Sequence, residues 1–430
     1  MRNIGKEIHE FCKELWPINR SLTGEGVRET LKLIQKRLND MVIFEVPTGT
    51  KVFDWEVPKE WVIRDAWIVD PDGNKICDFK KNNLHLVGYS VPINKKMKLS
   101  ELQKKIHSLP EQPSAIPYIT SYYNEDWGFC MSHNERESLK NGEYEVYIDS
   151  ELKQGNLTYG EILIKGKSSK EIFLSTYICH PSMANNELSG PCIATFLSEW
   201  LTSKKNLRHS YRIIFIPETI GSITYLSKNF DHMKENVVGG FNISCVGDNR
   251  NYSFLPSRNG DTLSDKVAKH VLENIDSNYV KYSWEDRGSD ERQYCAPGID
   301  LPIASMMRTK YGMYDEYHTS LDDLENVVSP NGLEGGFDMY LKAISVIELN
   351  CFPKVKVMGE PQLGKRGLYP NTSTRESGKS VRLMMNLISW SDGTNSLIDI
   401  ADKCKVPVWE LQPLLKTLED NDLLSITHDI

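Results

Sequence analysis

A chain of 430 residues is too long for one ordinary hydrophobic core, so we expect two or three domains. Hydrophobic residues make up 40% of the chain and charged residues 26%, which is the balance of a folded globular protein. The formal net charge of -8 argues against a basic nucleic-acid-binding surface over the whole chain, although it leaves room for a small basic module.

The first 140 residues combine two helical patterns with a region of short strands and loops. Apolar residues recur at helical spacing in 5–16 and 25–39. Three further stretches predict strands: Val42–Val46, Trp61–Val69 and His85–Ser90. From 47 to 140 the sequence is rich in aromatic residues, prolines and turns, without alternation of helix and strand. We therefore predict a β-rich subdomain, 47–140, inserted into the main domain.

Strand and helix patterns alternate from residue 141 to residue 352. Apolar runs predict strands at Tyr144–Ile148, Gly160–Ile164, Ile172–Cys179, Tyr211–Ile216, Val237–Val246 and Leu301–Met306. Helical patterns lie between them at Ser189–Leu201, Ile220–Phe230, Thr262–Asn274 and 330–350. The alternation predicts an α/β fold, with a mixed, mostly parallel sheet and helices on both faces. Residues 1–46 and 141–352 would form this main domain.

The last part of the chain predicts a separate helical module. A linker containing proline and glycine is expected at Phe352–Arg375. Three helical stretches follow at Ser380–Ser389, Ser396–Lys403 and Val408–Asp420, ahead of an apolar Leu-Leu-Ser-Ile segment. That order resembles a winged helix-turn-helix over residues 375–430. Its expected recognition helix, Val408–Lys416, has one basic residue, whereas phosphate contacts need several. We therefore expect protein contacts, including a homo-oligomer, rather than a nucleic-acid partner.

The N-terminus and the cysteines indicate the cellular compartment of the protein and the redox state of its thiols. No apolar core of signal-peptide length opens the chain, and no stretch approaches the ~20 apolar residues that span a bilayer. We expect a cytoplasmic protein without a membrane partner. The nine cysteines are never spaced as Cys-x-x-Cys, which predicts reduced thiols and no thiolate zinc site. A bound metal would then take histidine and carboxylate ligands.

Three segments carry side chains with metal or acid-base chemistry. His180 follows the strand that ends near Cys179, Glu218 follows the next predicted strand, and His318 lies in an acidic, tyrosine-rich segment. Ligands bind outside the carboxyl ends of parallel strands, so these side chains would meet at one edge of the sheet. Two histidines and several carboxylates at one edge are what a zinc site requires.

Each segment also has a purely structural explanation. The residues after His180 could form a polar turn in which Asn185 or Asn186 caps the next helix. Glu218 could favour the N-terminus of a helix, and His318 could be a loop histidine before another helix. The functional interpretation rests on the three segments occurring together. Glu218, at the end of an apolar strand, would then suit a general base that activates water.

From about residue 140 to residue 350 the chain resembles the zinc exopeptidase superfamily of aminopeptidases and their glutaminyl-cyclase relatives. Four segments carry the resemblance: His180 after its strand, Asn186-Glu-Leu-Ser-Gly190, Glu218-Thr219 and His318-Thr-Ser-Leu-Asp322. Arg20-Ser-Leu-Thr-Gly-Glu-Gly-Val-Arg28 and Tyr317-His-Thr-Ser320 match, more closely, a bacterial aminopeptidase-like subfamily. Its members have an inserted domain of unknown function and a C-terminal winged helix, and some are associated with polysaccharide biosynthesis. The resemblance implies a zinc-dependent hydrolase of peptide or amide bonds, most specifically an aminopeptidase.

The chain departs from the family pattern at three metal-binding positions. The bridging Asp of the family falls on Asn186, and the second residue of its Glu pair is Thr219. The strand-end Asp of the family falls on Ser244, and Asp248, four residues on, could be a displaced ligand or a solvated turn residue. These losses favour one zinc ion over two. The predicted ligands are His180, His318 and one carboxylate, with Glu187 ahead of Asp248. Glu218 keeps the family's general-base position, and the resemblance implies that it passes a proton to the leaving amine.

The sequence is compatible with more than one mode of substrate recognition and more than one function. An acidic residue would hold an α-amine of a small peptide or amide substrate, and an arginine would hold an α-carboxylate. The candidates, each of which could instead form a structural ion pair, are Asp290, Glu291, Glu316, Arg292 and Arg308. A second reading is a zinc amidase or deacylase acting on an amino-sugar or polysaccharide-biosynthesis intermediate. A third is a non-catalytic ligand sensor that uses the winged helix as an interaction module.

Overall fold

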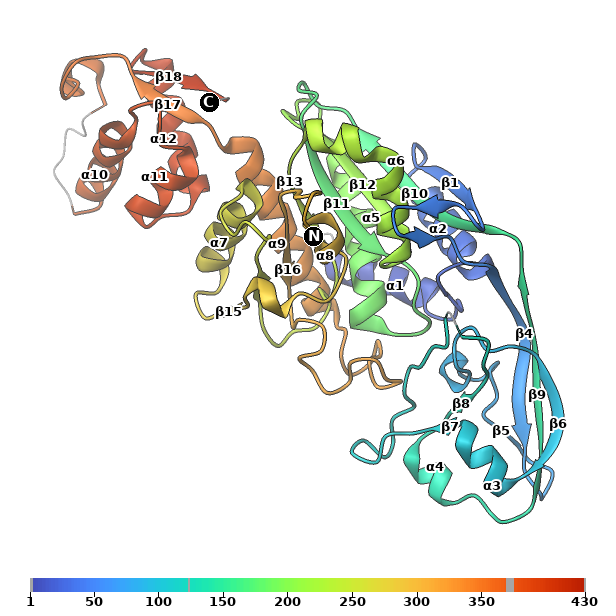
Figure 1. Cartoon of the computed structure of the whole chain (residues 1–430). Helices are drawn as coiled ribbons and strands as arrows, with labels where there is room; N and C mark the ends of the chain where they lie inside the picture. The colour runs from blue at the N-terminus through green and yellow to red at the C-terminus, as the bar shows by residue number, and fades with distance from the viewer. Residues whose placement is uncertain (1–2, 123, 369–374, 429–430) are drawn as a thin grey trace. The chain divides into compact units, whose positions relative to one another are not determined.

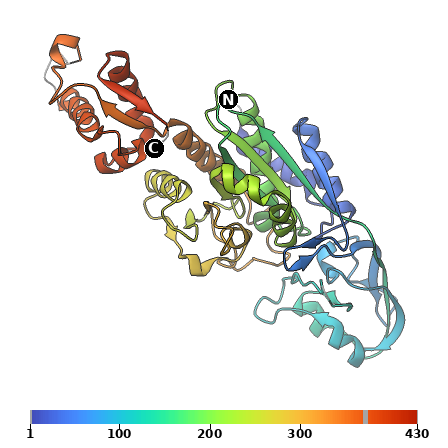
Figure 2. The ribbon, with the colours of Figure 1, turned by 45° about the horizontal axis from the view of Figure 1, so that its top comes forward.

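The computed structural model describes residues 3–122, 124–368 and 375–428, drawn in Figure 1 and Figure 2. Contacts divide the chain into two compact units. Unit 1 contains Met1–Ser264 and Val280–Asp338, and unit 2 contains Asp265–Tyr279 and Met339–Ile430. None of the helices in the described residues is long and apolar enough to cross a membrane.

Unit 1 is built on an eight-stranded sheet, with strand order β1-β10-β12-β11-β13-β16-β14-β15. These strands span β1 (Val42–Pro47), β10 (Asn156–Ile164), β11 (Glu171–Tyr177), β12 (Ser210–Ile216), β13 (Val237–Asn242), β14 (Ser253–Leu255), β15 (Val280–Lys281) and β16 (Ile303–Met307). The four central strands, β12, β11, β13 and β16, run parallel to one another. Strands β11 and β12 are buried along their whole length, because helices cover both of their faces. The predicted α/β fold is confirmed.

Helices of unit 1 form where the apolar residues recur at helical spacing. Outside the segment between β1 and β10 these are α1 (Ile4–Leu15), α2 (Glu25–Arg37), α5 (Ser189–Thr202), α6 (Ile220–Asn236) and the first part of α9 (Pro330–Leu349), and the short helix α8 (Glu291–Tyr294) forms without such a pattern. Helices α1 and α2 pack on α5, which lies against β10, β11 and β12. A short π-helix, η3 (Ala184–Leu188), leads directly into α5, with Ser189 N–H bonded to the Ala184 carbonyl. The sequence patterns predicted the longer helices but not this π-helix.

The segment between β1 and β10 contains a second sheet, drawn in blue to green in Figure 1. Its antiparallel strands are β5 (Lys75–Ile76), β4 (Glu60–Val69), β9 (Glu143–Lys153) and β6 (Ile93–Lys98), in that order. Around it lie β2 (Lys51–Val52), β3 (Trp55–Glu56), η1 (Asn83–His85), α3 (Leu99–Leu102), η2 (Gln103–Lys105), β7 (Ile106–His107), β8 (Phe129–Cys130) and α4 (His133–Glu137).

One strand predicted in this segment is wrong. Residues His85–Ser90 form the end of a 3-10 helix followed by isolated bridges at Leu86 and Gly88. Tyr89 has a φ of 67°, a left-handed conformation that ends any extended run. The apolar residues of this stretch are buried through loop packing and not through a strand.

Unit 2 contains a helical module closed by a small sheet. Its elements are most of α7 (Leu263–Ile275), the end of α9, β17 (Phe352–Val355), η5 (Gly364–Arg366), α10 (Arg375–Trp390), α11 (Leu397–Cys404), α12 (Val408–Asp420) and β18 (Leu424–Thr427). The predicted linker begins instead with β17, which pairs antiparallel with β18. The linker residues 369–374 lie outside the described residues. Three helices followed by a strand match the predicted winged helix, while the predicted domain boundaries stay a prediction.

Candidate metal centre

The predicted site residues come from loops at the carboxyl ends of the parallel strands. His180 lies three residues beyond β11, and Glu218 lies two residues beyond β12. His318 comes from the long connection between β16 and α9. The rings of His180 and His318 have centroids 5.5 Å apart, so the structure brings these two histidines together.

His180 contacts a buried carboxylate from η3. Nδ1 of His180 lies 2.8 Å from Oε2 of Glu187, and Sγ of Cys179 lies 3.4 Å from the same nitrogen. Potential ligand atoms of these three residues all lie within 4.8 Å of one another. Burial alone would favour the neutral imidazole, but Cys179 and Glu187 raise the pKa of His180 well above its ordinary value.

The π-helix explains how Glu187 reaches His180. The wider turn of Ala184–Leu188 places all five of its side chains in the protein interior. Single π turns of this kind frequently occur at functional sites. The side chain of Glu187 is fully buried and its Oε1 atom has no hydrogen-bond partner among the described residues. A buried, incompletely paired carboxylate is costly unless it binds a cation.

A buried arginine lies on the other side of Glu187. Nε of Arg20 donates to the His180 carbonyl at 3.0 Å, and Nη1 donates to the Leu15 carbonyl at 2.8 Å. Nε is also 3.6 Å from Oε1 of Glu187, and both side chains are fully buried. Arg20 opens the subfamily motif of residues 20–28, which was the one sequence signal for it, but nothing in that motif indicates that the arginine is buried beside Glu187.

His318 has an unusual environment for a histidine. Its φ is 56°, and no helix follows it, contrary to the prediction. Burial, followed by the charge of His180, lowers the pKa of His318 to about 3, so the imidazole is neutral. Its Nε2 atom is buried without a hydrogen-bond partner among the described residues. A neutral imidazole with an unpaired nitrogen is suited to bind a metal ion.

Tyr118 closes the site from the inserted segment. Its ring centroid lies 5.3 Å from both His180 and His318, and its hydroxyl lies 3.0 Å from that of Tyr122. The backbone N–H of Tyr118 donates to the His318 carbonyl at 2.9 Å. Sequence reasoning missed Tyr118, because the pairing that brings it here joins segments about 200 residues apart.

Glu218 faces the same space as the two histidines. Oε2 of Glu218 lies 3.7 Å from Nε2 of His180, and Oε1 accepts a hydrogen bond from Ser289 at 2.8 Å. Burial raises the pKa of Glu218, while His180 opposes the shift. The next residue, Thr219, has a φ of 61°, which is strained for a β-branched side chain. Its N–H donates to Asp290 at 2.7 Å, which helps to hold this turn.

Asn186 and Asp322 organise the loops without entering the cluster. Oδ1 of Asn186 accepts from the hydroxyl of Tyr177 at 2.9 Å, and its Nδ2 has no partner among the described residues. Asp322 accepts from the backbone of Asn185 and Asn186 at 2.7 and 3.0 Å. These bonds join the π-helix to the segment that carries His318. Burial raises the pKa of Asp322 to about 6.

Asp248, the alternative carboxylate ligand, has other partners. Its side chain accepts hydrogen bonds from Asn185, Arg250 and both donors of Thr309, at 2.7 to 3.0 Å. Like His318, it lies outside the group of Cys179, His180 and Glu187 whose potential ligand atoms lie together among the described residues, but unlike His318 it has all of its side-chain oxygens hydrogen-bonded. The geometry therefore favours Glu187 over Asp248 as the site carboxylate.

The candidate substrate-reading residues also have intramolecular partners. Arg308 donates to the Asp248 carbonyl and to Asn249, while Glu316 makes a two-point ion pair with Arg250. Partners of the other three are Thr219 and Ser222 for Asp290, Asn242 and Tyr311 for Glu291, and Thr219 for Arg292. The hydrogen bond from Arg292 to Thr219, the residue after Glu218, is exposed to solvent. These bonds account structurally for the residues and leave the substrate contact unassigned.

Two family models together match nearly the whole chain. The family model described as "Domain of unknown function (DUF4910)" matches residues 9–350. A winged helix-turn-helix model matches residues 351–426. A Clostridium acetobutylicum protein is 46% identical over 405 residues, covering 93% of this chain and 91% of that protein. Its name is "Putative polysaccharide biosynthesis protein with aminopeptidase-like domain".

Solved structures show the same fold. A crystal structure described as that of a "putative peptidase" from Clostridium acetobutylicum has a TM-score of 0.92 and 44% identity, covering 98% of this chain and 96% of that chain. A zinc aminopeptidase from Bacillus subtilis has a TM-score of 0.58 at 12% identity, covering 80% of this chain and 94% of that chain. The second likeness extends to the fold alone, which is the aminopeptidase-like fold.

Proposed function

We propose that this chain, which belongs to the family described as "Domain of unknown function (DUF4910)", is a zinc-dependent hydrolase of peptide or amide bonds. The aminopeptidase-like name of its 46%-identical relative supports the reaction class. The zinc aminopeptidase from Bacillus subtilis, which shares its fold, is consistent with zinc as the metal. Within the class, release of an N-terminal residue from a small peptide or amide is the first candidate activity.

The unpaired nitrogen of His318 beside His180 is the observation that carries the proposal. Nε2 of His318 and Oε1 of Glu187 are buried atoms without hydrogen-bond partners among the described residues. Both residues are of types that bind zinc, and both lie beside His180: the His318 ring has its centroid 5.5 Å from that of His180, and the other Glu187 oxygen, Oε2, lies 2.8 Å from His180 Nδ1. We assign His180, His318 and Glu187 as the ligands. Burial raises the pKa of Cys179 to about 11. Because a bound zinc ion would itself deprotonate a coordinating thiol, Cys179 is kept as an alternative third ligand.

A single metal ion fits the surrounding charges better than two. The amide of Asn186 supplies no charge to bridge two cations, and Thr219 supplies no second carboxylate. The guanidinium of Arg20, 3.6 Å from Glu187, adds a fixed positive charge where a second metal ion would require a negative environment. Arg20 therefore replaces, in part, the charge that a second metal would supply.

Glu218 is the proposed general base. Zinc, when bound, would polarise the scissile carbonyl and lower the pKa of a nearby water molecule. The carboxylate of Glu218 faces His180 and is oriented by Ser289, so it is placed to take a proton from the attacking water. Burial raises its pKa toward the range in which a carboxylate can also return that proton to the leaving amine.

Hydrolysis of aminoacyl amides tests this proposal directly. We expect the zinc-loaded protein to release the amine, and we expect the Glu218→Gln variant to bind zinc without turnover. A Glu285→Gln variant is the matched control, because this exposed glutamate pairs with Arg287 away from the site. Turnover that persists in Glu218→Gln, or in protein stripped of metal, would refute the assignment.

Cleavage of an acyl group from an amino sugar is the second candidate activity. The relative named for polysaccharide biosynthesis favours it, and it requires the same metal and the same base. Parallel assays with aminoacyl amides and N-acylated amino sugars distinguish the two. The sensor role would hold only if neither substrate class were turned over.

The winged helix is proposed as a protein-contact module. Helix α12 contains Glu410, Glu419 and Asp420 against the single basic residue Lys416. A negatively charged recognition helix opposes phosphate binding. We propose a protein partner, including a second copy of this chain, and a salt-dependent shift of duplex DNA at micromolar protein would contradict it.

A further inference from the structure

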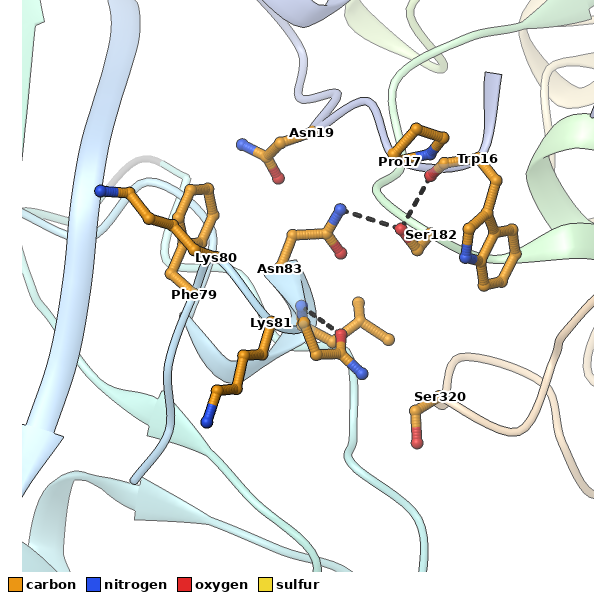
Figure 3. Close-up of a pocket in the computed structure, with 11 residues that line it drawn as sticks. Trp16, Pro17, Asn19, Phe79, Lys80, Lys81, Asn83, Ser182 and Ser320 are labelled. Carbon is orange, nitrogen blue, oxygen red and sulfur yellow. Dashed lines mark hydrogen bonds between the residues drawn. The ribbon is translucent and has the colours of Figure 1, made fainter. Parts of the chain in front are cut away.

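A polar cleft lies beside the proposed metal centre in unit 1. Its volume is about 290 Å³, near the small end of the ~300–1,000 Å³ typical of small-molecule sites. Four parts of the chain line it: the turn after α1, the 79–84 segment of the insert, the loop of Ser182 and the loop of Ser320. Figure 3 shows Trp16, Phe79, Asn83 and Ser320 around this space.

The cleft shares two loops with the proposed metal centre. Ser182 and Ser320, which line it, each lie two residues after a proposed ligand, His180 and His318. A second, smaller hollow shares Asn83 with the cleft and is also lined by Arg20, Tyr118 and Pro181. Its volume of about 10 Å³ is that of roughly one water molecule. A ligand in the cleft would therefore lie next to the residues that surround His180.

The lining has the polar groups that hydroxyl-rich ligands require. Nδ2 of Asn83 donates to Ser182 at 2.9 Å, and the Ser182 hydroxyl donates to the Trp16 carbonyl at 3.0 Å. This chain of bonds fixes the Asn83 amide, as the dashed lines in Figure 3 show. Oδ1 of Asn83 is buried with no partner among the described residues, so it is an acceptor without a donor. A ligand hydroxyl would satisfy it.

The charge of the cleft selects against a free amine. Lys80 and Lys81 line it, and none of its described lining residues is a carboxylate. Lys80 pairs with Asp65 at 3.1 Å, whereas Lys81 is exposed, and Figure 3 shows its side chain extending outward, away from Asn83 and Ser182. An α-ammonium group would meet like charge here, whereas a carboxylate or phosphate would meet a cation. Trp16 and Phe79 add apolar surface for the non-polar face of a ring.

We propose that this cleft binds an anionic sugar, which is the non-reacting part of the substrate. The inference rests on the proposed hydrolase function of the neighbouring site, and it adds the chemical class of the group beside the scissile bond. The sugar hydroxyls bond to the amides and hydroxyls of Asn83, Asn19 and Ser320. The carboxylate or phosphate of the sugar binds Lys81.

Binding of small sugars to the full-length protein tests the proposal. Glucuronic acid, glucose 6-phosphate, glucose and leucinamide are titrated at millimolar concentration and followed by calorimetry or saturation-transfer NMR. We expect one or both anionic sugars to bind, and glucose to bind more weakly by about fivefold, the upper value of an exposed charge pair. Binding of the uronic acid alone identifies a carboxylate, and binding of the sugar phosphate alone identifies a phosphate.

Variants locate the binding in the cleft. Lys81→Gln should weaken the anionic sugar by about fivefold without affecting folding, because the side chain is exposed. Asn83→Asp keeps the shape of the side chain and should abolish binding through the added negative charge. Lys96→Gln, an exposed lysine of β6 outside the cleft, is the matched control and should bind as the unchanged protein does.

Failure of this inference is distinguishable from failure of the proposed hydrolase function. Sugar binding is repeated in the His180→Ala variant, where it should persist. Protein that hydrolyses aminoacyl amides but binds neither anionic sugar overturns the inference and leaves the hydrolase. Sugar binding that is equal in Lys81→Gln, Asn83→Asp and the unchanged protein also overturns it. Sugar binding at the cleft in protein without metal or turnover supports the inference and refutes the hydrolase.

Discussion

Nδ1 of His180 lies 2.8 Å from Oε2 of Glu187, seven residues later in the chain. The pair joins the loop after β11 to the π-helix. In the family that the chain resembles, the bridging carboxylate lies at the position of Asn186, whereas here the carboxylate in the site is that of the next residue, Glu187. The site therefore retains a carboxylate next to its first histidine, although the neighbouring residue is an amide. This pair is the core of the proposed metal centre.

Changing Glu187 to Gln tests whether the carboxylate binds the metal. A neutral amide keeps the size of the side chain but loses the charge that zinc prefers. We therefore expect zinc affinity to fall by about 100-fold or more. Competition with a chelator of known affinity measures the change. Zinc affinity that stays within a few-fold of the unchanged protein would contradict Glu187 as a ligand.

Replacing Arg20 by Met should destabilise the protein. The change leaves Glu187 buried beside an apolar group, and breaking a buried ion pair costs about 3–5 kcal/mol. Urea unfolding measures this loss of free energy of unfolding. Arg64→Met is the matched control, because Arg64 is 51% exposed and pairs with Asp149 and Glu151 at the surface, where the cost is about 1 kcal/mol or less. Equal losses in the two variants would contradict the assigned role of Arg20.

Glu218→Gln should separate metal binding from catalysis. We expect zinc content to stay at the level of the unchanged protein and kcat to fall by ~10²–10⁴-fold, the usual contribution of a general base. Steady-state kinetics on an aminoacyl amide, with zinc measured on the same sample, gives both values. Loss of zinc together with activity would make Glu218 a ligand and not the base.

The pH dependence of stability should change in Asp290→Asn. Burial, followed by the charge of Glu218, raises the pKa of Asp290 to about 8. An unfolded aspartate titrates near pH ~3.9, so between about pH 4 and pH 8 the folded state holds a proton that the unfolded chain has lost. The free energy of unfolding therefore falls as pH rises through this window, by at most about 1.4 kcal/mol per pH unit.

The Asp290→Asn variant has no such proton to lose. Its free energy of unfolding should fall less steeply than that of the unchanged protein as pH is raised from about 5 to about 8. Urea unfolding at three or more pH values measures both slopes. Parallel slopes would show that Asp290 does not hold a proton in the folded state.

The hydrophobic patterns predicted the sheet because its strands are local and strongly apolar. Ile172–Cys179 and Tyr211–Ile216 are continuous apolar runs, and the structure has β11 and β12 there, each slightly displaced at its ends. Such runs can be buried only between two layers, so their pattern alone implied helices on both faces. His85–Ser90 shows the limit, since its apolar residues are buried in a loop whose backbone cannot form a strand.

Strand ends predicted one part of the site and the family resemblance another. His180 and Glu218 follow buried strands, so topology alone placed them at one sheet edge, whereas His318 and Glu187 were predicted through the resemblance. Tyr118 and Arg20 reach the same place through pairings between distant segments, and although Arg20 opens a subfamily motif, that motif indicated no role for it. The five-residue π-helix that turns Glu187 inward depends on packing around it, and no helical periodicity predicts such a turn.

Zinc content of the purified full-length protein, measured by elemental analysis with and without His180, tests the central claim most directly. We expect one zinc per chain in the unchanged protein and in His428→Ala, a control at an exposed histidine, and none in His180→Ala. A protein that takes up no zinc, or a His180→Ala variant that keeps it, would contradict the account of the metal centre.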